Sequence, residues 1–254
     1  MCFLNFSLTV AGNTTLNVSK FASWACWNDA RSINDNENLQ FPETVNADYL
    51  KTVNANIIFV GLNISRDIEN DWSNFHDTRP GSNDARLRWA IQNNELFKGA
   101  YMTDLIKGLR HSSSDYVKGY FQENKPSKNQ KRIDGYKDKE KDKAEGTFVS
   151  LEKHGDNFYE EMKQLETLDA YQKEEKVLLI FLGVTLEHDF LRQMLEKSKK
   201  LRDWKNKLGN RLLIRSIPNH AAHNNPDESE EDFRKRYCKL LSVIAEDYKK
   251  ATTY

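Results

Sequence analysis

Polar residues that could do chemistry follow two apolar segments that lie far apart in the chain. Residues 56–60 run into Gly61, Leu62 and Asn63, and residues 212–217 run toward His220. Side chains just beyond the carboxyl edge of a sheet are placed to meet ligands in open α/β folds. An asparagine carbonyl can orient a water molecule, and a histidine can donate a hydrogen bond to developing negative charge. If both segments are strands of one sheet, their ends converge on one substrate.

Four segments have the length and composition of buried parallel strands. Residues 56–60, 100–106, 177–182 and 212–217 are short and mostly apolar on both faces, as strands covered by helices on two sides are. Apolar residues recur at helical spacing between these segments and, most clearly, over residues 233–248 behind Ser229. We therefore predict an α/β fold of three layers, α/β/α, around a small four-stranded, mostly parallel and doubly wound sheet.

Length and composition fit one elaborated domain that spans residues 1–254. Hydrophobic residues make up 38% of the 254 residues, which is enough for one sizeable core. The 38 basic side chains balance 38 acidic ones. Nucleic-acid binding would therefore require a local basic patch rather than overall attraction.

Cysteine usage and the start of the chain bear on compartment and cofactors. Cys2, Cys26 and Cys238 are scattered, too few for a four-thiolate zinc or iron–sulfur site, and they indicate a reducing compartment. Residues 1–11 are partly apolar, but they lack a basic leader and are too short to span a bilayer. We therefore expect a cytoplasmic protein with no cofactor, no metal and no membrane contact.

One segment does not fit a compact layer. Residues 111–146 are poor in apolar side chains and rich in lysine, with aromatic residues interleaved, so they cannot bury enough surface to offset the entropy of ordering. This long insertion is either a basic flap that follows a nucleic-acid backbone and stacks bases, or a solvated loop whose lysines are balanced by acidic neighbours. The basic residues that would contact DNA are Lys125, Lys128, Lys131 and Arg132.

Four pieces of sequence stand in one order at the predicted strand ends. They are Gly61-Leu62-Asn63-Ile64-Ser65, Phe75, Asp104 and His220-Ala221-Ala222-His223-Asn224-Asn225-Pro226. Together they resemble the uracil-DNA glycosylase superfamily, as a divergent member most similar to its mismatch-specific and single-strand-selective branches. Those branches carry Gly-x-Asn-Pro-Gly after the first core strand and His-Pro-Ser-Pro after the last. In between, an aromatic residue stacks on the extruded base and a strand-end residue reads the base edge.

The resemblance implies a role for each matched residue. Asn63 would orient the attacking water and His220 would stabilise negative charge on the departing base, so these two are the candidate catalytic residues. The residues expected to bind the base are Gly61, Leu62, Phe75, Asp104 and His223, and those expected to contact DNA beside the basic insertion are Ser65, Asn224 and Asn225. Plainer interpretations are a core role for Phe75, a backbone hydrogen bond for His220 and a surface position for His223.

Departures from the family pattern bear on activity and substrate. Ile64 replaces a proline and Ala221-Ala222 replace Pro-Ser, so two rigid turns are missing. Asn224 stands where relatives carry a wedge that fills the hole left by the flipped base, which favours single-stranded DNA or a distorted duplex as the partner of a monomeric protein.

Two functions therefore remain open. The first is a monofunctional DNA glycosylase that hydrolyses the N-glycosidic bond of a damaged or modified base, in repair or in defence against foreign DNA. The second is a non-catalytic module that binds a nucleobase or nucleic acid on the same fold.

Asp104 bears on the choice of base. An ionised carboxylate only accepts hydrogen bonds, so it would favour an exocyclic amine over the O4 carbonyl of uracil. We therefore expect a cytosine-type or other amino-bearing base. The alternative is that Asp104 caps the next turn or pairs with Lys107.

Overall fold

A computed structural model of the chain describes most of the predicted core. The described residues are 7–10, 14–27, 53–63, 70–79, 82–107, 117, 150–183, 189–219 and 228–252. Most of the basic insertion and the motif that begins at His220 lie outside them.

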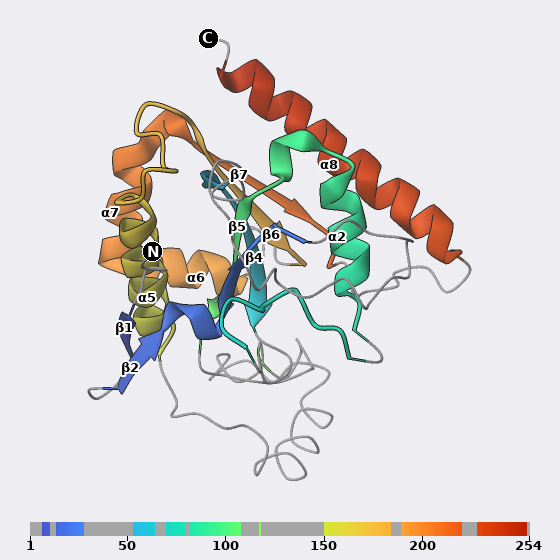
Figure 1. The fold of residues 1–254 in the computed structure, drawn as a ribbon. Helices are drawn as coiled ribbons and strands as arrows, with labels where there is room; N and C mark the ends of the chain where they lie inside the picture. Colours follow the sequence, from blue (N-terminus) through green and yellow to red (C-terminus); the bar gives the residue numbers. More distant parts are fainter. Residues whose placement is uncertain are drawn as a thin grey trace.

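A five-stranded mixed sheet forms the centre of the fold (Figure 1). Its order is β3 (Ala22–Trp24), β5 (Ala100–Ile106), β4 (Asn54–Asn63), β6 (Val177–Leu182) and β7 (Leu212–Ile217). The strands β5, β4, β6 and β7 are parallel, and β3 runs antiparallel to β5 at the edge. The predicted α/β class and mostly parallel sheet are confirmed, with five strands rather than four. The edge strand was missed because three residues, Ala-Ser-Trp, are too short to carry a pattern.

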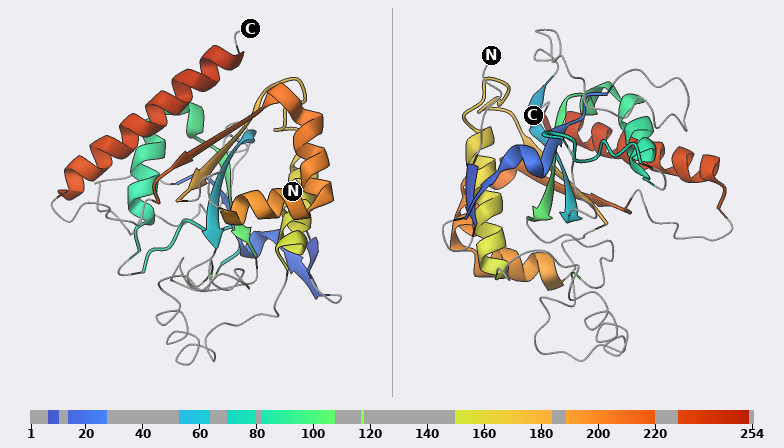
Figure 2. Two further views of the ribbon diagram at one scale, coloured as in Figure 1. Left: turned by 180° about the vertical axis from the view of Figure 1, so that it is seen from behind. Right: turned by 60° about the horizontal axis from the view of Figure 1, so that its bottom comes forward.

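Helices cover both faces of this sheet (Figure 1, Figure 2). On one face lie α2 (Asp84–Gln92) and α8 (Glu230–Thr252), and on the other lie α5 (Leu151–Leu165), α6 (Asp189–Lys197) and α7 (Lys199–Leu208). The 3-10 turns among the described residues are η1 (Val18–Lys20), η3 (Glu95–Phe97) and η4 (Gly209–Arg211). A separate antiparallel pair joins β1 (Ser7–Val10) to β2 (Thr14–Asn17).

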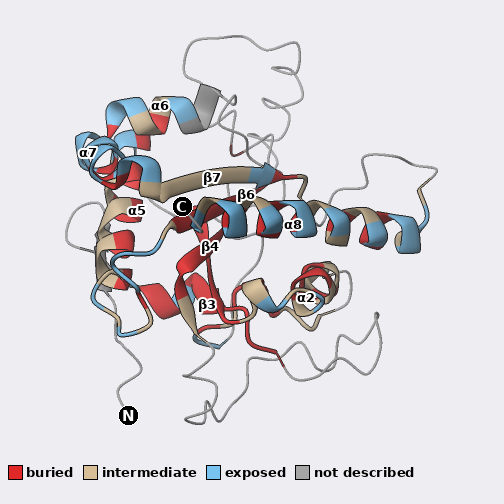
Figure 3. Ribbon diagram, turned by 90° about the horizontal axis from the view of Figure 1, so that it is seen from above, coloured by how far each residue is buried: buried red, intermediate tan, exposed pale blue. Residues whose placement is uncertain are grey.

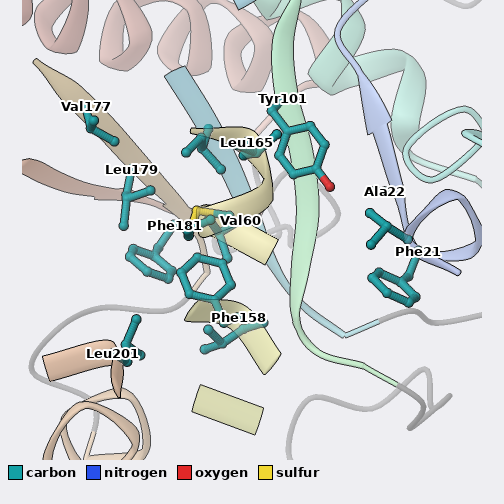
Figure 4. Packing of buried hydrophobic residues seen from close by; sticks show 14 of the residues in the cluster. Phe21, Ala22, Val60, Tyr101, Phe158, Leu165, Val177, Leu179, Phe181 and Leu201 are labelled. Atoms are coloured by element: carbon teal, nitrogen blue, oxygen red, sulfur yellow. The ribbon is translucent and has the colours of Figure 1, made fainter. Parts of the chain in front are cut away.

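Two apolar cores follow from the alternation of side chains along the strands. In β4, Ile57 and Phe59 face the core beneath α2 and α8, whereas Ile58 and Val60 face the core beneath α5, α6 and α7. This period of two is what an extended strand imposes. Figure 4 shows the second core, where Phe158 of α5 lies among residues of the sheet and of α7. Both faces of the strand are buried, so its sequence is a continuous apolar run.

Serine side chains set several helix starts. Ser150, Ser198 and Ser229 each accept a hydrogen bond from the backbone N–H three residues later, as N-caps do. Ser198 therefore divides the helical segment between β6 and β7 into α6 and α7. Its hydroxyl also donates to Asp156 Oδ1 of α5 at 2.7 Å, which ties the break to the neighbouring helix.

The strand order creates a switch point at the carboxyl ends of the strands. The chain passes from β4 to β5 on one side and then crosses to β6 on the other side of β4. The connection from β4 leads to β5 and the connection from β6 leads to β7, so the two diverge between the carboxyl ends of β4 and β6, and ligands of open α/β folds bind at such points. Residues 61–63 and 104 stand at this edge.

Within the described part of the chain, no helix is both long and apolar enough to cross a membrane.

The burial of the sheet predicts a matched pair of stability effects. Val177→Ala, at a fully buried position of β6, should lower the free energy of unfolding by about 2 kcal/mol, because two methyl groups are lost and the space is incompletely refilled. Val243→Ala is the control, since Val243 is 51% exposed and alanine favours helix. Val243 belongs to α8, which carries exposed residues along its length (Figure 3). Urea unfolding followed by circular dichroism measures both. Equal effects would contradict the assignment of β6 to the core.

Candidate functional site at the strand ends

Parallel pairing of β4 with β5 brings Gly61 beside Asp104. The two residues are register partners, and Asn63 pairs with Ile106 one step further along the edge. Gly61, Leu62 and Asp104 are buried, while Asn63 is half-buried. Gly61, Asn63 and Asp104 thus lie at or near the carboxyl ends of β4 and β5.

Gly61 is approached so closely that no side chain would fit. A Cβ atom built there would lie 2.2 Å from Asp104 Oδ1 and 3.0 Å from the Phe75 ring atom Cζ. The missing side chain therefore allows a carboxyl group from β5 and an aromatic ring from the following loop to meet over one backbone position. We call Gly61, Phe75 and Asp104 the strand-end site.

Phe75 reaches this position from a loop with an unusual backbone. Trp72 and Phe75 have φ angles of 61° and 62°, in the left-handed region that side chains rarely adopt. The Phe75 side chain is 8% exposed and belongs to the core beneath α2 and α8. Phe75 therefore packs mainly as a core residue, and the edge of its ring faces Gly61.

Hydrogen bonds fasten this loop, residues 72–76, to the segment that contains β3. Trp72 N donates to Ser19 O at 2.7 Å, and Ser23 Oγ donates to Asn74 O at 2.5 Å. Further along, His76 Nε2 lies 3.1 Å from Trp24 O. Because a carbonyl only accepts, Nε2 of His76 carries the proton. The edge strand that the sequence did not reveal is therefore the support of the Phe75 loop.

Asn74 connects the loop to Asp104. Its Nδ2 donates to Asp104 Oδ2 and to Phe21 O, both at 2.8 Å, and its Oδ1 accepts from Phe75 N at 3.1 Å. Sequence reasoning missed Asn74. Its position directly before the aromatic residue was the one available signal.

Burial raises the pKa of Asp104 from 3.8 to about 7. The Asn74 hydrogen bond and the charge of Lys107 oppose this rise, whereas the charges of Glu161 and Asp84 add to it. Asp104 therefore exists in both protonation states near neutral pH, unlike the ionised carboxylate assumed from sequence alone.

Lys107 forms its ion pair with a different acidic residue from the one that the sequence suggested. Its Nζ donates to the backbone carbonyl of Asp104 and forms an ion pair of 2.7 Å with Glu161 Oε2, with both side chains fully buried. Glu161 Oε1 also accepts from Tyr101 and Thr103, each at 2.7 Å. One feature of the sequence indicated a buried partner for Lys107. Glu161 is an acidic residue within the apolar stripe of α5. The charge of Lys107 also helps burial to lower the pKa of nearby His154 to about 3.

The ends of β6 and β7 approach each other next to this edge. Gly183 has a φ of 73°, its N–H donates to Ile217 O at 2.8 Å, and a Cβ there would lie 2.8 Å from the Cβ of Asn219. The chain that leads to His220 therefore leaves β7 over the end of β6.

Several predicted site residues lie outside the described residues, so their roles stay predictions. They are Ser65, Lys125, Lys128, Lys131, Arg132, His220, His223, Asn224 and Asn225. Among the residues that are described, no group of three or more His, Cys, Asp or Glu side chains could hold a metal ion.

Comparisons with protein-family models, curated proteins and solved structures find no match to this chain.

The close approach at Gly61 predicts a steric effect. Gly61→Ala should lower the free energy of unfolding by about 1–3 kcal/mol, because the Asp104 carboxyl group and the Phe75 ring must both move. Gly209→Ala is a comparison without a steric neighbour, and its backbone alone, with φ 51° and ψ −124°, should cost roughly 1–3 kcal/mol. Chemical denaturation compares the two. A variant at Gly61 as stable as the parent would mean that the three residues do not pack as described.

The raised pKa of Asp104 predicts a pH dependence of stability. The unfolded chain loses this proton near pH 4 and the folded chain near pH 7, so the unfolded state binds fewer protons between these values and stability falls as pH rises through this window. The two pKa values differ by an amount that corresponds to about 4 kcal/mol. Asp104→Asn should therefore gain stability relative to the parent from pH 4 to 7. Exposed Asp203→Asn, measured by the same urea titrations, should show no such trend.

Proposed function

We propose that this protein is a DNA glycosylase that hydrolyses the N-glycosidic bond of a damaged or modified base. The observation that carries the proposal is the meeting of Phe75 and Asp104 over Gly61 at the carboxyl edge of β4 and β5. These are three of the positions to which the family resemblance assigns base recognition, and they come from three separate segments of the chain.

In the proposed reaction, Asn63 would orient the attacking water molecule. Cleavage leaves positive charge on the deoxyribose and negative charge on the departing base, so the reaction needs an oriented water on one side and a hydrogen-bond donor on the other. Asn63 ends β4 one residue beyond Leu62 and is half-buried, so its carbonyl can orient a water at the rim of the site. His220, which follows β7, would donate to the base.

Asp104 would read the base edge in a way that depends on its proton. The protonated carboxyl can donate to a base carbonyl, and the ionised form accepts from an exocyclic amine. Because its pKa is about 7, the protein offers both forms near neutral pH. This extends the sequence expectation of an amino-bearing base to carbonyl-bearing bases at lower pH.

A non-catalytic base-binding module is the second candidate. The tight burial of Phe75 and Asp104, together with the missing prolines of both motifs, favours it. In either case the partner would be DNA, single-stranded or distorted, bound by a monomer. The basic insertion would contribute phosphate contacts.

Release of a base from oligonucleotides distinguishes these candidates. The protein is incubated with single-stranded oligonucleotides that carry a panel of bases, and alkali then reveals abasic sites. Asn63→Ala should slow single-turnover cleavage by a factor on the order of 100 or more while DNA binding is largely kept, because only the water is displaced. His220→Gln should slow the same step. Exposed Asn210→Ala is the matched control and should cleave as the parent does. Binding without cleavage of any base would favour the module.

The proton on Asp104 predicts a change of base preference with pH. Below about pH 7 uracil-type bases should be removed faster relative to cytosine-type bases, and above it the order should reverse, with each base-edge contact worth on the order of 1–3 kcal/mol. Asp104→Asn, which has no titrating proton, should show a preference independent of pH. The same pH trend in both proteins would remove Asp104 from base recognition.

A further inference from the structure

The Asn74 side chain makes three of the four hydrogen bonds that its amide can form, and both of its donor hydrogens are used. Its nitrogen donates to Asp104 Oδ2 and to Phe21 O, and its oxygen accepts from Phe75 N. A flipped amide would set oxygen against two acceptors and nitrogen against a donor, so these contacts fix its orientation. Asn74 is 8% exposed, so water can do little to replace a lost partner.

Two of these contacts act on residues of the strand-end site, and the third anchors the amide. The bond to Oδ2 holds one oxygen of Asp104, so the other, Oδ1, faces Gly61. The bond from Phe75 N restrains the backbone where φ is 62°, a conformation that costs about 1–2 kcal/mol in a residue with a side chain. The bond to Phe21 O anchors the amide to the segment before β3.

We propose that Asn74 is a positioning residue that orients the Asp104 carboxyl group and holds Phe75 against Gly61 through one side-chain amide. This deepens the proposed function, on which it rests only for the roles of the two residues that Asn74 positions. Asn74 would then link the placement of the stacking ring to the proton that selects the base.

The other groups around Asp104 determine how a change at Asn74 would appear. Lys107, directly after β5, favours the ionised form, and Glu161 on α5 and Asp84 on α2 disfavour it. The Asn74 hydrogen bond is the strongest influence that favours ionisation. Its removal should therefore raise the pKa of Asp104, whereas a residue that only fills space would leave the pKa unchanged.

Carboxyl carbon NMR of labelled protein tests this directly, with the Asp104 signal identified by its loss in Asp104→Asn. Asn74→Asp keeps the acceptor for Phe75 N but turns an oxygen toward Asp104. It should raise the titration midpoint by about one pH unit or more, at least tenfold in acid dissociation constant. Asn74→Ser, which is shorter and uncharged, should raise it less.

Two controls separate positioning from general disturbance. Asn94→Asp makes the same exchange at the cap of η3, where the side chain only accepts, and should leave the midpoint unchanged. Ser23→Ala removes the hydroxyl that donates to Asn74 O but keeps the amide contacts, and should also leave it unchanged.

Unchanged midpoints in both Asn74 variants would overturn the proposal. So would failure of both to fold while Ser23→Ala folds, since Asn74 would then be structural alone. The readout needs no DNA, so the two ideas can fail separately. A raised midpoint in a protein that releases no base from any oligonucleotide would keep Asn74 as positioning residue and reject the glycosylase.

Discussion

The absence of a side chain at Gly61 is the constraint on which the site depends. Parallel register sets Asp104 beside Gly61, but only a bare backbone leaves room for Oδ1, and for the Phe75 ring at the same point. Asp104 gives up hydration there and receives one side-chain amide in return, which is why its carboxyl group holds its proton so strongly. The same contact thus determines geometry and charge.

A second buried polar group lies on the opposite face of β5. The ion pair of Lys107 and Glu161 would be costly without further partners, because desolvation can exceed the attraction between the charges. Here Tyr101 and Thr103 satisfy Glu161, and the ammonium group of Lys107 also lies over the rings of Phe21 and Phe158 at 5.2 and 5.4 Å. Loss of either charge would leave the other buried alone, so the pair fixes one arrangement of β5 and α5.

Local pattern predicted most of the fold and less of the site. Apolar runs gave the bounds of β5, β6 and β7, and the stripe behind Ser229 gave α8. The pattern could not reveal β3, whose three residues are defined by pairing with β5. For the site, strand ends indicated Gly61 and Asp104. The hydrogen bond from Asn74 to Asp104 and the raised pKa of Asp104 could not be predicted, because both depend on residues that meet only after folding.

The position of β3 has a consequence for the order of folding. Ala22 pairs with Thr103, and the loop that carries Phe75 is fastened to Ser19, Phe21, Ser23 and Trp24. This early segment leaves the ribosome well before its partner strand, and contacts so distant in sequence form slowly because a long loop must first close. The aromatic ring therefore gains its fixed place only when this early segment has returned to a later part of the chain, and that return completes the site.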